Sequence, residues 1–298
     1  MSNKRHLDAQ ALNEVLNQAG VDTDGDLEIT ELTEGTFNTV YRIGADLVLK
    51  VSPDPAAPVL TYEKDLIRTE ALFYEAARGK APVPEVVHSG DDHLLMTALP
   101  GTTMQAVTGA ERAVLRRELG GIVSTLHEVT GPGFGYPQKG LVPTWSAAFL
   151  SMIDDVLADA SRFGVKLPRP PEQLRQLVLE RFDLLDAVRT PRLIHFDLWD
   201  GNILVEDGRI TGLVDGERAF WGDPVAEFVS LTLFSTSVDA DLLAGYGALD
   251  PGETLSLYRI YLYLIMLIEG TPRGYAGPDH DAMLQLILRH LNKELDRL

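Results

Sequence analysis

Residues 192–224 place an unusual number of polar side chains between two apolar runs. The stretch reads RLIHFDLWDGNILVEDGRITGLVDGERAFWGDP, and its candidates for chemistry are His195, Asp197, Asp200, Asn202, Asp215, Glu217 and Asp223. Carboxylates are costly to bury unless something positive pairs with them. The stretch is therefore either a pair of solvated loops or a place where a cation binds.

Three of these residues follow a spacing that is typical of phosphoryl transfer. Asp197 and Asn202 lie five residues apart, and Asp215 comes after a predicted hairpin. In that signature one aspartate receives the proton of the acceptor hydroxyl, the asparagine binds metal, and the later aspartate binds the metal ion that bridges the phosphates. Because a transferring phosphoryl group is strongly negative, such a site needs Mg²⁺ on hard oxygen ligands.

The same chemistry requires a positive group for the phosphates that do not react. Lys50 lies in LVLKV, a predicted strand, and Glu70 on the following helix could hold its ammonium group. Lys50 by itself would be interpreted as a surface lysine whose apolar stem covers other residues. Its position ahead of the catalytic signature favours a role in nucleotide binding.

Two further segments are candidates for nucleotide contacts. EGTFNTVY contains Gly35, Thr36, Asn38 and Thr39, whose amides and hydroxyls could donate to a β-phosphate, although a turn with one glycine has little specificity. In LLMTALPG, the backbone of Thr97 to Leu99 could pair with an adenine edge. The alternative for this segment is an ordinary strand between two domains.

Composition limits the classes of partner. The chain has 298 residues, with 26 Lys and Arg against 44 Asp and Glu, a formal charge of −18. This charge disfavours nucleic acid and anionic membranes and favours a cationic ligand, although many proteins are acidic for solubility alone. Cysteine is absent, which excludes disulfides, thiolate metal sites and cysteine nucleophiles. The first twenty residues lack the apolar core of a signal peptide and YLYLIMLIEG is too short to span a bilayer, so we expect a cytoplasmic protein.

Hydrophobic periodicity predicts the elements that hold these residues. Strands are expected at 27–33, 39–44, 46–51, 82–90 and 93–101, with a later hairpin at 203–214 that turns at Asp207 and Gly208. Helices are expected at 7–19, 62–79, 111–128, 146–161, 172–188, 252–270 and 279–295. The prediction is a bilobal α+β fold, with an antiparallel sheet and a helix in residues 1–98 and a mostly helical lobe in residues 99–298. A ligand would bind in the cleft between the lobes.

At these residues the chain resembles the aminoglycoside phosphotransferase and choline kinase group, small-molecule kinases with the protein kinase fold. The resemblance runs from about Leu27 to Phe228 through EGTFNTVYR, LVLKV, RTEALFYEAARGKAPVPEVV, LLMTALPGTTM, IHFDLWDGNILV and GLVDGERAFWGDPVAEF. It implies ATP or GTP as donor, magnesium, a free hydroxyl as acceptor, Asp197 as base, and Glu217 as a residue that helps to hold a second metal ion. The chain departs from the group at Phe196, where glycine is usual, and at Gly216, where an aromatic residue is common.

The acceptor site is the least specified part of the sequence. Trp199 either stacks on a ligand or fills core, Asp200 suits an amine on the acceptor or is a solvated loop residue, and Glu269 is a further candidate for an amine. The predicted acceptor is an aminoglycoside-like or other sugar-containing antibiotic. Alternatives are a metabolic kinase of a ketosamine or choline-like metabolite, and a nucleotide-binding pseudokinase.

Four residues near the signature are expected to be structural. His195 should brace the loop that carries Asp197, and Asp223 and Glu227 should cap a helix and brace the same loop. His127 is expected to be a core histidine beneath the loop. None of the four is predicted to transfer a proton.

Overall fold

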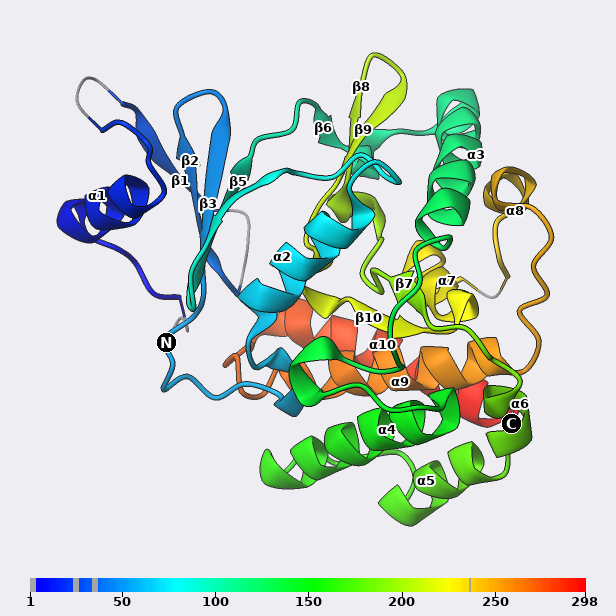
Figure 1. Cartoon of the computed structure of the whole chain (residues 1–298). Helices are drawn as coiled ribbons and strands as arrows, with labels where there is room; N and C mark the ends of the chain where they lie inside the picture. The colour runs from blue at the N-terminus through cyan, green and yellow to red at the C-terminus, as the bar shows by residue number, and fades with distance from the viewer. Residues whose placement is uncertain (1–3, 24–26, 34–36, 236) are drawn as a thin grey trace.

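The computed structural model describes residues 4–23, 27–33, 37–235 and 237–298 (Figure 1). Its first part is a five-stranded antiparallel sheet in the order β1-β2-β3-β5-β4. The strands are β1 (Ile29–Leu32), β2 (Thr39–Ile43), β3 (Leu47–Val51), β4 (Val86–Ser89) and β5 (His93–Thr97). The predicted meander of the first three strands is confirmed, and the two later strands join its far edge.

Two helices cover opposite faces of this sheet, and the alternation of side chains along the strands explains why. Helix α1 (Ala9–Gln18) packs with Leu49 and Leu95, whereas α2 (Leu66–Ala77) packs with Leu94 and Met96. Neighbouring residues of a strand point to opposite faces. Lys50, which pairs with Leu94 in the β3–β5 register, therefore shares the face that α2 covers.

The rest of the chain is mostly helical (Figure 1). Its helices are α3 (Gly109–Leu126), α4 (Trp145–Arg162), α5 (Pro171–Leu179), α6 (Phe182–Asp186), α7 (Phe228–Leu231), α8 (Ala240–Tyr246), α9 (Thr254–Glu269) and α10 (Pro278–Leu295). Most of the residues of α9 are buried, on all sides of the helix, because it lies between neighbours that include α4 and α10. The α+β fold class is confirmed, whereas the division at residue 98 stays a prediction.

Short strands set the geometry around the signature residues. The hairpin of β8 (Ile203–Glu206) and β9 (Arg209–Leu213) turns at Asp207 and Gly208, both with positive φ, as predicted. Strand β6 (Thr102–Thr103) pairs with β8, and β7 (Arg192–Ile194) pairs with β10 (Phe220–Gly222). Strands β6, β7 and β10 were not predicted, because two or three residues carry no periodic pattern.

One predicted helix was wrong in its extent. Residues 172–188 form α5 and α6 rather than one helix, because the backbone of Arg181 leaves the helical region at φ −116° and ψ 18°. The amide of Arg181 donates to the carbonyl of Val178, three residues back, and its guanidinium donates to the carbonyl of Leu298. A tertiary contact thus takes over where the helical hydrogen bonds stop.

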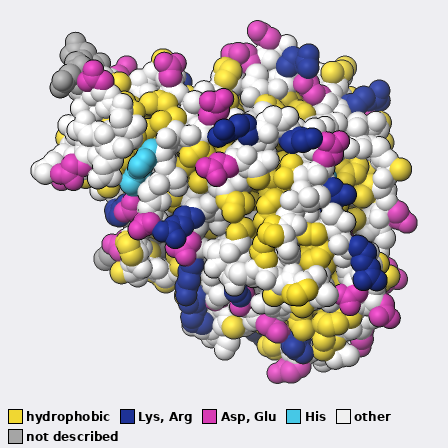
Figure 2. All heavy atoms as spheres, in the orientation of Figure 1, with side chains coloured by type: hydrophobic (Ala, Val, Ile, Leu, Met, Phe, Trp, Pro, Cys, Tyr) yellow, Lys and Arg dark blue, Asp and Glu magenta, His cyan; other side chains and the backbone are white. Residues whose placement is uncertain are grey.

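The surface agrees with a strongly acidic chain whose charges are dispersed. Figure 2 shows acidic and basic side chains interspersed over one face of the molecule. Within the described ranges, no helix is long and apolar enough to cross a membrane.

Candidate active site

The predicted signature residues line one cavity between the sheet and the helical part. Its volume is about 820 Å³. Its lining includes Asn38, Lys50, Asp197, Trp199, Asn202, Asp215, Glu217, Arg218 and Arg273. Strand β3 supplies Lys50, the loop between β7 and β8 supplies Asp197 and Asn202, and the segment after β9 supplies Asp215. Lys50 and Asp215, 165 positions apart in the sequence, are thus brought together.

Lys50 lies at the centre of an ionic cluster on the sheet side. Only 3% of its side chain is exposed, and Nζ lies 2.7 Å from Oε2 of Glu70, Oδ1 of Asp215 and Oε2 of Glu217. Burial works to lower the pKa of Lys50, but Asp215, Glu217 and Glu70 together raise it well above its ordinary value. The ammonium group is therefore charged, and it is held in a fixed position.

Tyr74 of α2 joins this cluster and was not predicted. Its hydroxyl donates to Oε1 of Glu70 at 2.7 Å and accepts from the backbone amide of Asp215 at 3.0 Å. Burial raises the pKa of Glu70, and the Lys50 ammonium opposes that rise. Tyr74 lies four residues after Glu70, one helical turn away, and this spacing was the only signal in the sequence.

The loop that carries Asp197 is braced from below. The Glu227 carboxylate accepts the amides of His195 and Phe196 at 2.8 and 2.9 Å. Nε2 of His195 lies 2.9 Å from the carbonyl of Val214, and Nδ1 accepts the amide of Asp197 at 3.2 Å. Both ring nitrogens are thus engaged with backbone, which gives His195 a positioning role rather than a role in proton transfer.

Two more of the predicted structural residues lie under this loop. Asp223 accepts the amide of Val225 and the hydroxyl of Tyr258, at 3.0 and 2.7 Å. Buried His127 has Nδ1 2.9 Å from the hydroxyl of Tyr246 and Nε2 3.6 Å from Glu227. Neither residue faces the cavity, so both serve the packing that positions the loop.

The departures at Phe196 and Gly216 have a geometric explanation. Phe196 has a φ of +66°, a conformation that favours glycine, and its ring packs 5.0 Å from Phe220 and 5.7 Å from Tyr261. This packing offsets a backbone cost of roughly 1–2 kcal/mol. At Gly216, an added Cβ would lie 2.3 Å from the ring of Phe73, so the space that a side chain would need is already filled.

Asp197 faces the cavity with its carboxylate a quarter exposed. Burial raises its pKa above the ordinary 3.8, and the Arg218 guanidinium, whose Nε lies 3.5 Å from Oδ2, opposes the rise. The carboxylate therefore combines proton affinity with a fixed cationic neighbour. Such a group can accept a proton from a hydroxyl at neutral pH.

Asn202 and Asp215 fit a magnesium ion bound together with phosphates. The Asn202 amide donates from Nδ2 to the carbonyl of Asp197 at 2.8 Å, which leaves Oδ1 as the acceptor end, and about half of the Asp215 side chain is exposed. Burial works to raise the pKa of Asp215, but the Lys50 ammonium lowers that pKa below its ordinary value. The carboxyl group is therefore anionic. Among the described residues no three His, Cys, Asp or Glu form a complete metal site. This suits Mg²⁺, which takes few protein ligands and completes its shell with phosphates and water.

Glu217 differs from the other predicted metal ligands. Its Oε2 already accepts Nδ2 of Asn38 at 2.7 Å and contacts Lys50. Glu217 therefore holds two polar side chains of the cleft, Asn38 and Lys50, together.

Two of the predicted nucleotide-binding residues, Gly35 and Thr36, lie outside the described residues. Asn38, from the same predicted segment, lines the cavity and contacts Glu217.

The predicted adenine-binding segment is partly committed to the sheet. The amide of Thr97 donates to Glu85 at 2.9 Å, and that of Ala98 donates to Asp46 at 2.7 Å. Those two amides cannot also donate to a base. A backbone amide that donates to adenine would therefore have to be that of Leu99, whereas carbonyl groups of the segment could accept from the adenine amino group.

The acceptor side contains arginines that the sequence analysis missed. Asp200 is 2.7 Å from Arg112, and Glu269 is 2.9 Å from Arg218 and 3.1 Å from Arg273. Both predicted amine-binding carboxylates thus already have cationic partners. Trp199 is 40% exposed beside the cavity, so the core position considered for it is wrong.

Comparison with known proteins agrees with this geometry. The model of the phosphotransferase enzyme family matches residues 28–258. A protein of Enterococcus faecium named a probable ketoamine kinase is 22% identical over 285 residues, which cover 87% of this chain and 94% of that protein.

Two solved structures share the fold. The ternary complex of streptomycin, ATP and APH(2″)-IIa has a TM-score of 0.66 at 18% identity, covering 98% of this chain and 97% of the other. Macrolide 2′-phosphotransferase MphH of Brachybacterium faecium has a TM-score of 0.58 at 23% identity, covering 95% and 98%. The predicted kinase-like fold is confirmed.

Proposed function

We propose that this chain, which belongs to the phosphotransferase enzyme family and is a small-molecule phosphotransferase, uses ATP to phosphorylate a hydroxyl of a sugar-containing small molecule. The observation that carries the proposal is the shared cavity, in which Lys50 with its carboxylates lies on one side and Asp197 on the other. Phosphoryl transfer needs these two elements, a fixed cation for phosphates and a base for the hydroxyl.

In the proposed reaction Asp197 orients the acceptor hydroxyl and takes its proton. The hydroxyl oxygen forms a bond to the γ-phosphorus as the bond from that phosphorus to the β–γ bridging oxygen breaks, and ADP leaves. Arg218, 3.5 Å from Asp197, fixes the carboxylate and offsets negative charge beside the transferred group. Because Glu227 and His195 hold the loop backbone, the base is positioned before the acceptor arrives.

The donor side follows from the residues that surround Lys50. We assign Lys50 to the nonreacting phosphates, Glu70 to its orientation, and the backbone of Leu99 to the adenine edge. Asn202 and Asp215 would hold Mg²⁺, which when bound neutralises the phosphate oxygens of ATP. Residues 1–98 then bind most of the nucleotide, and residues 99–298 bind the acceptor.

Two settings fit a sugar-containing acceptor. Phosphorylation of an antibiotic is supported by the fold shared with the streptomycin and macrolide enzymes. Phosphorylation of a ketosamine is supported by the relative in Enterococcus faecium. The charges of the acceptor side separate these settings further.

The test is ADP formation from ATP and Mg²⁺ with aminoglycosides, macrolides and ketosamines as acceptors. Asp197→Ala should lower turnover at least about 100-fold, because it removes the base. Its affinity for ATP, measured by thermal shift, should stay within twofold of the wild type. Asp183→Asn, a change at an exposed carboxylate of α6, is the matched control and should keep full turnover.

Two results would contradict the proposal. One is near-normal turnover of Asp197→Ala. The other is stabilisation by ATP without ADP formation on any acceptor, the behaviour of the pseudokinase alternative. Turnover that Asp197→Ala abolishes and Asp183→Asn preserves supports the assignment.

A further inference from the structure

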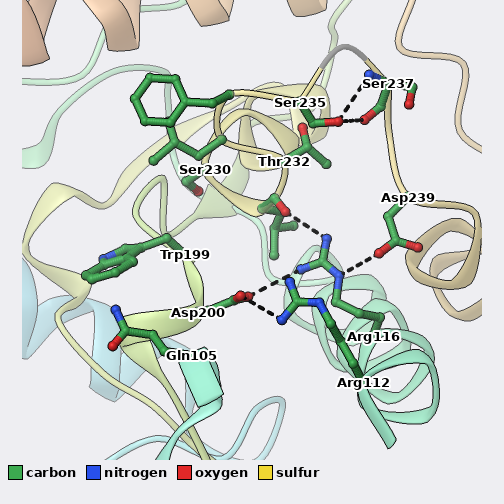
Figure 3. Close-up of a pocket in the computed structure, with 13 residues that line it drawn as sticks. Gln105, Arg112, Arg116, Trp199, Asp200, Ser230, Thr232, Ser235, Ser237 and Asp239 are labelled. Carbon is green, nitrogen blue, oxygen red and sulfur yellow. Dashed lines mark hydrogen bonds and ion pairs between the residues drawn. The ribbon is translucent and has the colours of Figure 1, made fainter. Parts of the chain in front are cut away.

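A second cavity opens beside the catalytic one. Its volume is about 560 Å³, and it lies between α3, the loop after Asp197 and residues 230–235, 237 and 239 (Figure 3). Trp199 and Gln105 line both cavities. A molecule whose hydroxyl lies at Asp197 can therefore extend past these two side chains into the second cavity.

Trp199 contributes to the lining of both cavities. It is 40% exposed, whereas the other two tryptophans, Trp145 and Trp221, are buried. An added Cβ at Gly201 would lie 2.4 Å from the indole, so the glycine lets the ring lie against the backbone. An exposed aromatic ring held in this way is suited to stack on the apolar face of a sugar.

The acidic side chains of the second cavity are already engaged. Asp200 contacts Arg112 at 2.7 Å. Asp239 accepts Nε of Arg116 at 2.9 Å and the amides of Asp241 and Leu242 at 2.8 and 3.3 Å. Each carboxylate thus already faces a guanidinium group, since Oδ1 of Asp200 also lies 4.0 Å from Nη1 of Arg116.

Hydrogen-bond donors remain in the same cavity. Arg112, which Figure 3 shows extending from α3 toward Asp200, is about a third exposed and uses one of its five N–H donors in that contact. Arg116 is 97% buried, and its Nη1 lies 4.0 Å from Oδ1 of Asp200 but makes no hydrogen bond within the part of the chain that the structure describes. The unused capacity is therefore donor capacity, which a ligand meets with oxygen acceptors.

The acidic residues on the Asp197 side follow the same rule. Glu269 contacts Arg218 and Arg273, and Glu63 is paired with Arg273. The remaining carboxylates of the catalytic cavity, Asp197, Asp215 and Glu217, are assigned to the reaction or to Lys50. An acceptor with several amines has no matching anions here.

We propose that the acceptor carries a carboxylate that binds Arg112 in the second cavity, while its sugar ring stacks on Trp199 and its hydroxyl lies at Asp197. A guanidinium binds a carboxylate through two parallel hydrogen bonds, which fix direction as well as charge. The acceptor class is a sugar acid or a ketosamine that retains the carboxylate of its amino acid. This inference rests on the proposed function, because it places the acceptor around Asp197.

The test compares acceptors that differ in this one group. ADP formation is measured with glucuronate and glucuronamide, with fructosyl-glycine and fructosyl-glycinamide, and with streptomycin as the polycationic acceptor. We expect kcat/KM for at least one acid to exceed that for its amide by about tenfold or more, the usual value of a charge-assisted hydrogen bond.

Variants on α3 then test the residue. Arg112→Gln should raise KM for the acid at least about tenfold and leave KM for ATP unchanged, and Arg112→Lys should recover part of the loss, because it keeps charge without the planar fork. Arg117→Gln is the matched control, since Arg117 lies on the same helix, pairs with Asp241 at 3.2 Å and does not line the cavity. Thermal unfolding of each variant separates a loss of folding from a loss of binding.

The outcomes distinguish this inference from the proposed function. An acid preference that disappears in Arg112→Gln and persists in Arg117→Gln supports it. ADP formation with amides, amines or streptomycin but with no acid, or an acid preference that Arg112→Gln retains, overturns it and leaves the proposed function standing. If none of the acceptors tested supports ADP formation, both this inference and the proposed function are overturned.

Discussion

The two sides of the catalytic cavity are both built from ion pairs, but their charges balance differently. On the sheet side, Glu70, Asp215 and Glu217 surround the single ammonium of Lys50. On the helical side, Arg218 and Arg273 meet Glu63 and Glu269. The sheet side thus keeps two negative charges in excess, which suits a metal ion. On the helical side the charges of the two arginines and the two glutamates cancel, and Asp197 adds one carboxylate.

This difference assigns separate tasks to the two sides. An excess of carboxylates is stable only when further cations arrive, so the sheet side is prepared for Mg²⁺ with ATP. The helical side offers guanidinium donors, and we propose that these orient the acceptor. In that proposal the local ion pairs, and not the net charge of −18 of the whole chain, determine which acceptor binds.

The largest expected effect comes from breaking the sheet side. Lys50→Met leaves three carboxylates without their cation and should lower the free energy of unfolding by about 3–5 kcal/mol, as removal of one partner of a buried pair does. Turnover should be lost as well. Denaturant unfolding of this variant is compared with Lys80→Met, whose exposed pair with Glu128 has the same 2.7 Å separation and should contribute far less to the free energy of unfolding, because water screens it. Equal losses in the two variants would contradict the assigned importance of the cluster.

A smaller effect is expected from the packing that aligns Asp215. Gly216→Ala places a Cβ 2.3 Å from the ring of Phe73 on α2, and overpacking of this kind costs about 1–3 kcal/mol. KM for ATP should rise, because α2 also carries Glu70. The control is Gly121→Ala on α3, where the nearest atom would be 3.9 Å away and the helix should gain up to about 1 kcal/mol. Thermal unfolding gives the change in stability of both variants. A Gly216→Ala variant as stable as the wild type would mean that the Phe73 ring moves aside, and it would contradict the expected overpacking.

The smallest effect probes the helical side through pH. Arg218→Met removes the cation that opposes the burial-driven rise of the Asp197 pKa, so that pKa should rise further. Asp197 accepts a proton only when ionised, and kcat falls as the pH drops through its pKa. The acid limb of the pH profile of kcat should therefore move to higher pH, with turnover near neutral pH reduced about tenfold. An unmoved acid limb would show that Arg218 does not act on Asp197.

The sequence predicted the sheet side better than the helical side, for a physical reason. Lys50, Glu70, Asn202 and Asp215 occur in short motifs whose spacing reflects their shared chemistry, and all four line or support the same cavity. Most helices and strands also followed from periodicity. The contribution of Tyr74, a single hydroxyl one turn from Glu70, needed the structure.

The arginine partners could not be predicted in the same way. Arg112 meets Asp200, and Arg218 meets Glu269 across 51 residues, only because α3 and α9 approach the catalytic loop in the folded chain. Seen in the sequence, Asp200 and Glu269 were candidates for binding an amine. Their pairing with arginines is a tertiary property, and it is the basis on which we propose an acidic acceptor.

The assignment of Asp197 to the acceptor hydroxyl and of Lys50 to the phosphates is tested most directly by a crystal structure with Mg²⁺, a nonhydrolysable ATP analogue and an acceptor that supports ADP formation. We predict that the acceptor hydroxyl lies within hydrogen-bond distance of the Asp197 carboxylate, that Asn202 and Asp215 bind Mg²⁺, and that Lys50 contacts the phosphates. An acceptor hydroxyl placed away from Asp197, or a triphosphate that does not reach Lys50, would contradict it.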